Sequence, residues 1–202
     1  MSLQKEHIIY FERLKAFFNN YMNMPGAEFD MLVPFFEVRS FDKKAQIVKM
    51  GEVDNYFNII AKGLVRKYTL AGKKEVTLQL ATEGHAIHSE VSFNRRVPSD
   101  VIVETIEPSV FLSLTYDHLQ EIYNTFPRTE RLGRLVTIDM YMKKDLRDYS
   151  HFRQNSRERF LHYIQNHQEM VQRVPQKYLA SYLHIKPETF SRLKHLVRKK
   201  KS

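Results

Sequence analysis

The chain has 202 residues, of which 43% are hydrophobic and 12% aromatic, and its formal net charge at pH 7 is +9. Fourteen Phe and eleven Tyr residues supply enough apolar surface to offset the entropy lost on folding, which excludes a mainly disordered protein. Because the sequence contains no Cys, disulfides, thiolate-bound metals and cysteine-held iron–sulfur clusters are excluded as well. No stretch of about 18 apolar residues occurs, so we expect a cytoplasmic protein without a membrane partner.

Helices are predicted before about residue 40, because apolar residues recur there at steps of three and four. The first series is Ile8, Phe11, Leu14 and Phe18, and the second, after the break at Pro25-Gly26, is Phe29, Leu32 and Phe36. The simplest role of both series is packing.

Short β-type runs follow between about Val38 and Leu114. They comprise residues 46–49, 56–61, 64–70, 76–80, 102–106 and 110–114. Gly51, Gly63, Gly72 and Gly84 separate these runs at intervals of 12, 9 and 12 residues, and Gly best tolerates the positive φ of tight turns. This spacing predicts a small antiparallel β-roll.

A long helix is predicted from Pro127, a residue suited to a first helical turn, to Tyr149. Its heptad-like apolar series, interrupted by Asp139, is Leu132, Leu135, Met142, Leu146 and Tyr149. Apolar periodicity cannot distinguish burial within one chain from burial between two, so the helix either covers the roll or forms the seam of a homodimer. We favour the homodimer, because the helix is long for a small protein.

Three further helices are predicted after this one. The first runs from about Ser156 to Met170, with Phe160, Tyr163 and Ile164 on one side. Pro175 and Pro187 can each open a helix, and His184-Ile185-Lys186 forms the turn between these two. Their inward residues are Leu179, Ala180 and Leu183 in one helix and Phe190, Leu193 and Val197 in the other. This arrangement is typical of a helix-turn-helix, in which small Ala180 allows close approach and Ile185 fills the angle between the helices.

The positive charge is concentrated in this last segment. Residues Arg173 to Ser202 contain nine Lys and Arg residues and one acid, Glu188, and so carry +8 of the net +9. Such a local excess indicates a polyanionic partner, and the helix pair favours double-stranded DNA. The alternative is that a basic amphipathic helix only keeps its charged face in water.

The expected DNA-binding residues lie on the outward face of the last helix and around it. Arg, Glu and hydroxyl side chains read base edges in the major groove, and Lys and Arg hold phosphates. The set is Lys177, Lys186, Glu188, Thr189, Ser191, Arg192, Lys194 and Arg198.

Several motifs together resemble the Crp/Fnr superfamily of transcription regulators. They are Gly51-Glu52, the stretch YFNIIAKGLV at 56–65, Gly72, Gly84, VPQKYLASYL at 174–183 and PETFSRL at 187–193. The resemblance implies an α+β fold with three parts. These are a sensor β-roll with N-terminal helices at 1–126, a dimerisation helix at 127–150 and a helix-turn-helix domain at 151–202. It also implies that Glu188 and Arg192 contact bases.

The sequence departs from this family at its ligand site. Cyclic-nucleotide binders of this type have a Gly-Glu pair and, later, an Arg-Ser pair that holds the cyclic phosphate. Here Ser99 and Asp100 stand where Arg and Ser are expected, so we expect no binding of cyclic AMP or cyclic GMP. An unidentified effector remains open, and the residues that could bind it are His88, Glu90, Arg95, Arg96 and Ser99.

Two departures concern the DNA-binding part. His184 stands where relatives often have Gly, although His is among the commoner non-Gly residues in the left-handed conformation. The chain also leaves no evident room for a β-hairpin wing after the last helix, so phosphate contacts would come mainly from Arg198 and the lysines at 199–201.

Two other classes of protein stay open. His85, His88 and Glu90 resemble the metal cluster of a cupin enzyme, but on a strand His85 would point away from the other two. A non-DNA interaction protein could use the basic tail to bind RNA, but the tail lacks outward aromatic residues for base stacking. We therefore expect a homodimeric regulator that is not an enzyme and has no catalytic residue, metal or cofactor.

Overall fold

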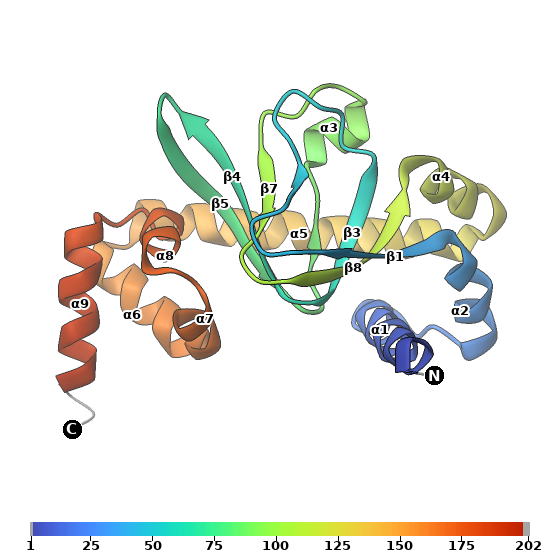
Figure 1. The fold of residues 1–202 in the computed structure, drawn as a ribbon, viewed down its shortest axis with the longest axis horizontal. Helices are drawn as coiled ribbons and strands as arrows, with labels where there is room; N and C mark the ends of the chain where they lie inside the picture. Colours follow the sequence, from blue (N-terminus) through green and yellow to red (C-terminus); the bar gives the residue numbers. More distant parts are fainter. Residues whose placement is uncertain (1, 200–202) are drawn as a thin grey trace.

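The computed structural model describes the backbone of residues 2–199 and the side chains of residues 8–195. Three parts follow one another along the molecule: N-terminal helices at one end, a β-roll in the middle and a group of short helices at the other end (Figure 1). The long helix α5 (Pro127–Arg153) runs behind the roll and joins the two ends. No helix in the described range is both long and apolar enough to span a membrane.

The N-terminal part consists of α1 (Ser2–Asn19), α2 (Gly26–Leu32) and a 3-10 turn (Val33–Phe35). Leu14, Phe18, Phe29 and Leu32 are buried in one cluster, which confirms the predicted packing role for most of both apolar series. Ile8 is an exception to the first series, because it is 60% exposed. Phe36 is an exception to the predicted second helix, because it is the first residue of strand β1.

The roll is formed by two four-stranded antiparallel sheets with the orders β1-β8-β3-β6 and β2-β7-β4-β5. The strands are β1 (Phe36–Phe41), β2 (Gln46–Val48), β3 (Tyr56–Lys62), β4 (Leu64–Ala71), β5 (Lys74–Thr82), β6 (Ala86–Ile87), β7 (Ile102–Thr105) and β8 (Ser109–Thr115). Each predicted run coincides with a strand, and β1, β6 and the short helix α3 (Glu90–Arg95) are additional. Ile60, Val65, Val103 and Phe111 form the core between the sheets.

Gly63 occupies the tightest turn of the roll, between β3 and β4. All four predicted turn glycines have positive φ, but only at Gly63, with φ of 108°, does another segment pass close by. A Cβ atom there would lie 2.7 Å from Ser109 Cβ and 2.8 Å from the Pro108 carbonyl oxygen. The next turn, at Gly72, has open space around the same position.

Six helices follow the roll. They are α4 (Tyr116–Thr125), α5, α6 (Ser156–Asn166), α7 (Gln168–Arg173), α8 (Gln176–Tyr182) and α9 (Pro187–Lys199). The single helix predicted from Ser156 to Met170 is wrong in one respect, because it breaks at His167, whose φ of −139° and ψ of 55° are not helical. The break turns the chain so that Met170 and Val174 pack into the same core as Phe160.

Helix α5 has two different apolar faces. Leu132 and Val136 are buried in the N-terminal cluster. Leu132 was predicted as the first residue of the dimer seam, and this part of the prediction is wrong, because the residue packs within its own chain. Further along, a stripe of large apolar side chains is exposed, and Phe152 reaches 90% exposure. This α5 stripe consists of Ile138, Tyr141, Met142, Leu146, Tyr149 and Phe152.

The two turns provide a test of the roll. We expect Gly63→Ala to lower the free energy of unfolding by about 3 kcal/mol, because it adds a clash with β8 to the strain of positive φ. Gly72→Ala should cost only about 1 kcal/mol, since it carries the backbone strain alone. Urea unfolding of both variants measures the difference, and equal losses would contradict the close approach at Gly63.

Candidate DNA-binding surface and sensor roll

Helices α8 and α9 form a helix-turn-helix. The turn is closed by the Ile185 amide, which donates to the Ala180 carbonyl at 2.9 Å, and by the His184 amide, which donates to the Ser181 carbonyl at 3.1 Å. His184 has φ of 52°, the left-handed conformation expected where relatives often have Gly. The predicted packing is confirmed, because Ala180 and Ile185 are buried at the crossing of the two helices.

The inner side of α9 is anchored by one aromatic contact. Phe190 is buried and meets Phe160 of α6 edge to face, with ring centroids 5.0 Å apart. Since one side of α9 is fixed in this way, its opposite side is turned away from the protein.

The predicted DNA-binding residues lie on this outward side and beside it. Lys177, Lys186, Glu188 and Arg192 are exposed, and Thr189, Ser191 and Lys194 are partly exposed. Within α9, the Arg192 guanidinium lies 3.4 Å from the Thr189 hydroxyl. The side chains of Arg198 and Val197 fall outside the described side chains.

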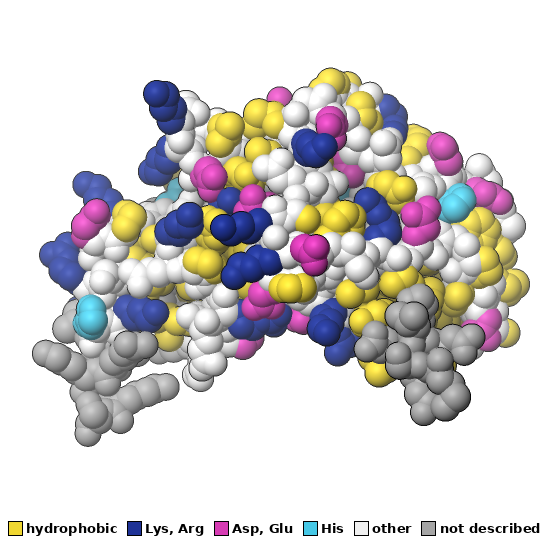
Figure 2. All heavy atoms as spheres, viewed as in Figure 1, with side chains coloured by type: hydrophobic (Ala, Val, Ile, Leu, Met, Phe, Trp, Pro, Cys, Tyr) yellow, Lys and Arg dark blue, Asp and Glu magenta, His cyan; other side chains and the backbone are white. Residues whose placement is uncertain are grey.

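Two lysines that the sequence analysis did not select lie near this surface. Lys73 and Lys74 are exposed at the tip of the β4–β5 hairpin. Burial lowers the pKa of His184, and the charges of Arg147, Arg159 and, least of all, Lys74 lower it further. Figure 2 shows Lys and Arg side chains gathered at the end of the molecule that carries this hairpin and the C-terminal helices. The Lys-Lys pair after Gly72 was visible in the sequence, but nothing in it indicated that the hairpin reaches the helix-turn-helix.

The helix-turn-helix is docked on the roll through a buried guanidinium. Arg66 of β4 is only 2% exposed. Its guanidinium carbon lies 3.9 Å from the ring centroid of Tyr68 and 3.8 Å from that of Tyr178 of α8. Its charge is balanced by Glu75 at 2.6 Å and Glu104 at 2.8 Å. Burial by itself lowers the pKa of Arg66, but hydrogen bonds to the two carboxylates raise it overall.

A second contact lies nearer the protein surface. Arg173 of α7 forms ion pairs with Glu83 at 3.0 Å and Glu107 at 2.7 Å, both in turns of the roll. Hydrogen bonds to Glu107 and Glu83 raise the pKa of Arg173. In addition, the Thr77 amide of β5 donates to the Ser181 hydroxyl of α8 at 2.9 Å.

The junction between α5 and the helix-turn-helix contains two stacked imidazoles. His151 of α5 and His184 have ring centroids 4.2 Å apart, and burial, followed by the charges of His184, Arg147 and Arg159, lowers the pKa of His151 to about 4. Arg159 of α6 donates to the Leu183 carbonyl at 2.9 Å and to the His184 carbonyl at 3.1 Å. The turn between α8 and α9 is therefore held by α5 and α6 together.

Two of the predicted effector residues, buried His88 and exposed Glu90, contact a buried lysine that the sequence analysis missed. Lys67 of β4 is buried, and its ammonium donates to Glu90 Oε1 and, at 3.2 Å, to the His88 carbonyl. Burial lowers the pKa of Lys67 despite the neighbouring Glu90 carboxylate. Burial would raise the pKa of Glu90, but the Lys67 ammonium holds it below its usual range.

The other three effector candidates lie apart from this cluster. The Arg96 guanidinium binds the Asn55 side chain and donates to the Asp54 carbonyl at 2.7 Å, so it stabilises the loop around α3. Arg95 is exposed, and the buried Ser99 hydroxyl donates to the Ser89 hydroxyl at 2.9 Å. The five residues therefore have different partners, and their role in effector binding stays a prediction.

The metal-site alternative assumed that His88 and Glu90 lie on one strand, and the structure contradicts this. Only Ala86 and Ile87 form β6, and Glu90 begins helix α3, so His88 and Glu90 are not on one strand face. His85 is exposed and contacts the Thr82 carbonyl at 3.2 Å. Among the residues that the structure describes, no three His, Cys, Asp or Glu side chains are placed to hold a metal ion.

Comparison with known proteins identifies the architecture. Residues 38–126 match the family of the cyclic nucleotide-binding domain. CLP, a c-di-GMP-responsive global regulator from Xanthomonas campestris, superposes with a TM-score of 0.69 at 12% identity over 87% of this chain and 93% of that one. FixK2 from Bradyrhizobium japonicum gives 0.68 at 17% identity over 82% and 85%. A protein from Eubacterium rectale assigned to the Crp/Fnr family gives 0.64 at 11% identity over 88% and 85%.

The fold is that of the Crp/Fnr regulators. The resemblance that the sequence motifs predicted is thereby confirmed for the whole architecture, from the N-terminal helices to the C-terminal ones. No curated protein sequence matches the chain. In this Crp/Fnr fold, the interior of the roll holds Lys67, and the predicted recognition helix is α9.

The buried imidazole of the roll provides a pH test. His88 packs between Phe57 and Phe93, and burial lowers its pKa to about 4 from 6.5. The unfolded chain takes up a proton between these values and the folded chain does not, so the stability contributed by neutral His88 is lost as pH falls from about 6.5 towards about 4.

We expect His88→Phe to remove this dependence. The free energy of unfolding of the variant minus that of the unmodified protein should increase by about 2 kcal/mol as pH falls through this window, because only the unmodified protein loses stability at His88. Urea unfolding across the window measures the difference, with His85→Phe, an exposed position, as the control. Parallel pH curves for His88→Phe and the unmodified protein would contradict the buried neutral imidazole.

Proposed function

We propose that the protein is a homodimeric, sequence-specific DNA-binding transcription regulator. The observation that carries the proposal is the outward face of α9, where Glu188 and Arg192 are exposed while Phe190 fixes the opposite side. A helix presented in this way fits the major groove, and Arg and Glu are side chains that read guanine and cytosine there. The positive charge of the C-terminal segment supplies the sequence-independent attraction to phosphates.

Dimerisation through the α5 stripe accounts for the exposed apolar side chains of that helix. Contiguous exposed apolar surface on a single chain indicates an interface, and the stripe faces away from the chain's own core. A two-fold dimer would place two copies of α9 about 34 Å apart, one turn of DNA, so the target should be an imperfect palindrome.

Within this proposal the roll does not bind cyclic AMP. Ser99 is engaged with Ser89, and the carboxylate of Asp100 stands where a phosphate-binding Ser is expected. The Lys67–Glu90 pair already neutralises the buried cation of the roll interior. The roll then either senses a ligand of another class or has lost sensing.

The assignment of Arg192 can be tested on DNA. Sequences bound by the purified protein are first selected from random duplexes, and affinities are then measured by fluorescence anisotropy. We expect Arg192→Ala to cost roughly 1 to 3 kcal/mol on the selected sequence and to relax preference at one base pair of each half-site. Lys186→Ala, an exposed phosphate-type contact, should weaken specific and random DNA alike. Equal losses on both DNAs for Arg192→Ala would refute its role in base recognition.

The dimer is tested at the centre of the α5 stripe. Leu146 is 64% exposed, and Leu146→Glu should convert the protein to a monomer at micromolar concentration, because it places a charge in an apolar interface. Sedimentation equilibrium measures the mass. Thr137→Glu, exposed on the same helix but outside the stripe, is the control and should stay dimeric. A dimeric mass for Leu146→Glu would place the interface elsewhere.

A further inference from the structure

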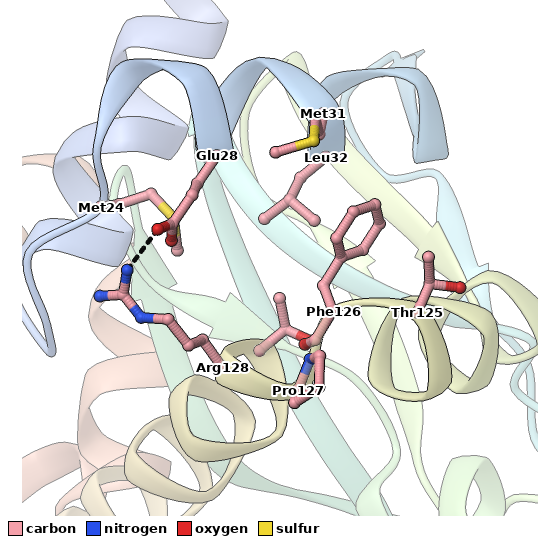
Figure 3. Close-up of a pocket in the computed structure, with 9 residues that line it drawn as sticks. Met24, Glu28, Met31, Leu32, Thr125, Phe126, Pro127 and Arg128 are labelled. Atoms are coloured by element: carbon pink, nitrogen blue, oxygen red, sulfur yellow. Dashed lines mark hydrogen bonds and ion pairs between the residues drawn. The ribbon is translucent and has the colours of Figure 1, made fainter.

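A cavity lies at the end of the molecule opposite the helix-turn-helix. It has a volume of about 200 Å³ and is enclosed by α2, the end of α4 and the first turn of α5. Its walls are mainly apolar and include Met24, Leu32 and Phe126. Figure 3 shows Leu32 and Phe126 pointing into the space between α2 and the start of α5.

One side of this cavity is closed by an ion pair. Arg128, in the first turn of α5, binds the Glu28 carboxylate of α2, and its guanidinium also donates to the Asn23 carbonyl at 3.2 Å (Figure 3). The Arg128 side chain is 51% exposed and that of Glu28 is 35% exposed. A pair with this exposure is held weakly, so another carboxylate can compete with Glu28 for the guanidinium.

We propose that this cavity binds a small aliphatic carboxylate. The ligand's chain would lie against Met24, Leu32 and Phe126, and its carboxylate would replace that of Glu28 on Arg128. Two features carry this inference: an apolar space and the guanidinium of Arg128 at its edge. Ligand pockets are usually roughly 300 to 1,000 Å³, so this one takes a short chain.

The position of the cavity connects it to the rest of the protein. Arg128 lies at the start of α5, whose 27 residues extend about 40 Å to the junction with the helix-turn-helix. A carboxylate that replaces Glu28 would separate α2 from α5 at this point. Binding itself does not depend on the proposed DNA-binding function and is tested without DNA.

The ligand class is tested by calorimetry on the full chain with hexanoate, hexanol and hexylamine. We expect hexanoate to bind, and hexanol and hexylamine to bind at least tenfold more weakly, because neither carries the charge that Arg128 recognises. No detectable binding of hexanoate at millimolar concentration would overturn the proposal. Equal binding of hexanoate and hexanol would also overturn it, because the cavity would then recognise only the alkyl chain.

Two variants of the ion pair distinguish a ligand site from a structural contact. Both Arg128→Gln and Glu28→Gln remove the pair and so lose its small contribution to stability. Hexanoate should nevertheless bind roughly tenfold more weakly to Arg128→Gln and severalfold more tightly to Glu28→Gln, in which Arg128 has lost its carboxylate partner. Lys143→Gln, which removes the exposed Lys143–Asp139 pair on the same helix, is the control and should leave affinity unchanged. Weaker binding in both Arg128→Gln and Glu28→Gln would overturn the proposed competition.

The location is tested by fluorescence. The chain contains no Trp, so Met31→Trp places a single reporter at the rim of the cavity, where Met31 is half exposed. Its emission should change with hexanoate, whereas that of Val91→Trp, an exposed position on α3, should not. Binding by calorimetry without a change in Met31→Trp would place the carboxylate elsewhere and overturn the assignment.

Discussion

The buried guanidinium of Arg66 joins the roll to the C-terminal helices. Its charge is met by Glu75 and Glu104 within the roll, but one of its two faces is covered by Tyr178 of α8. Removing a partner from a buried charge costs free energy, so the contact between Arg66 and Tyr178 stabilises the packing of α8 on the β4–β5 hairpin. The orientation of α9 is consequently tied to the sheet that contains β4.

Helix α5 connects the N-terminal cluster with the helix-turn-helix. Its first turns are packed against the N-terminal cluster through Leu132 and Val136, and its last turns meet the helix-turn-helix where His151 stacks on His184. Between these points the helix runs behind the roll (Figure 1), and its exposed stripe begins beyond the buried Leu132 and Val136. The first turns of α5 therefore belong to the core of the chain, whereas its later turns present exposed apolar side chains.

The interior of the roll has a different chemistry from that of a phosphate-binding roll. Lys67 supplies a cation, but Glu90 neutralises it and the His88 carbonyl accepts a hydrogen bond from it. His88 stays uncharged because it is enclosed by Phe57 and Phe93. The buried ammonium and the buried imidazole of the roll are therefore paired and neutral, respectively.

The sequence by itself determined six of the eight strands, the long helix α5, the helix pair α8–α9, the turn glycines and the inward side of α9, because periodicity and φ preferences are local. It could not determine the burial of Arg66 and Lys67, the break at His167 or the inward packing of Leu132. Those features depend on which elements meet and in what register, and partners far apart in the chain leave no periodic signal. Tertiary structure alone brought Glu90 to Lys67 and Tyr178 to Arg66, because a buried charge is stable only where packing supplies its partner.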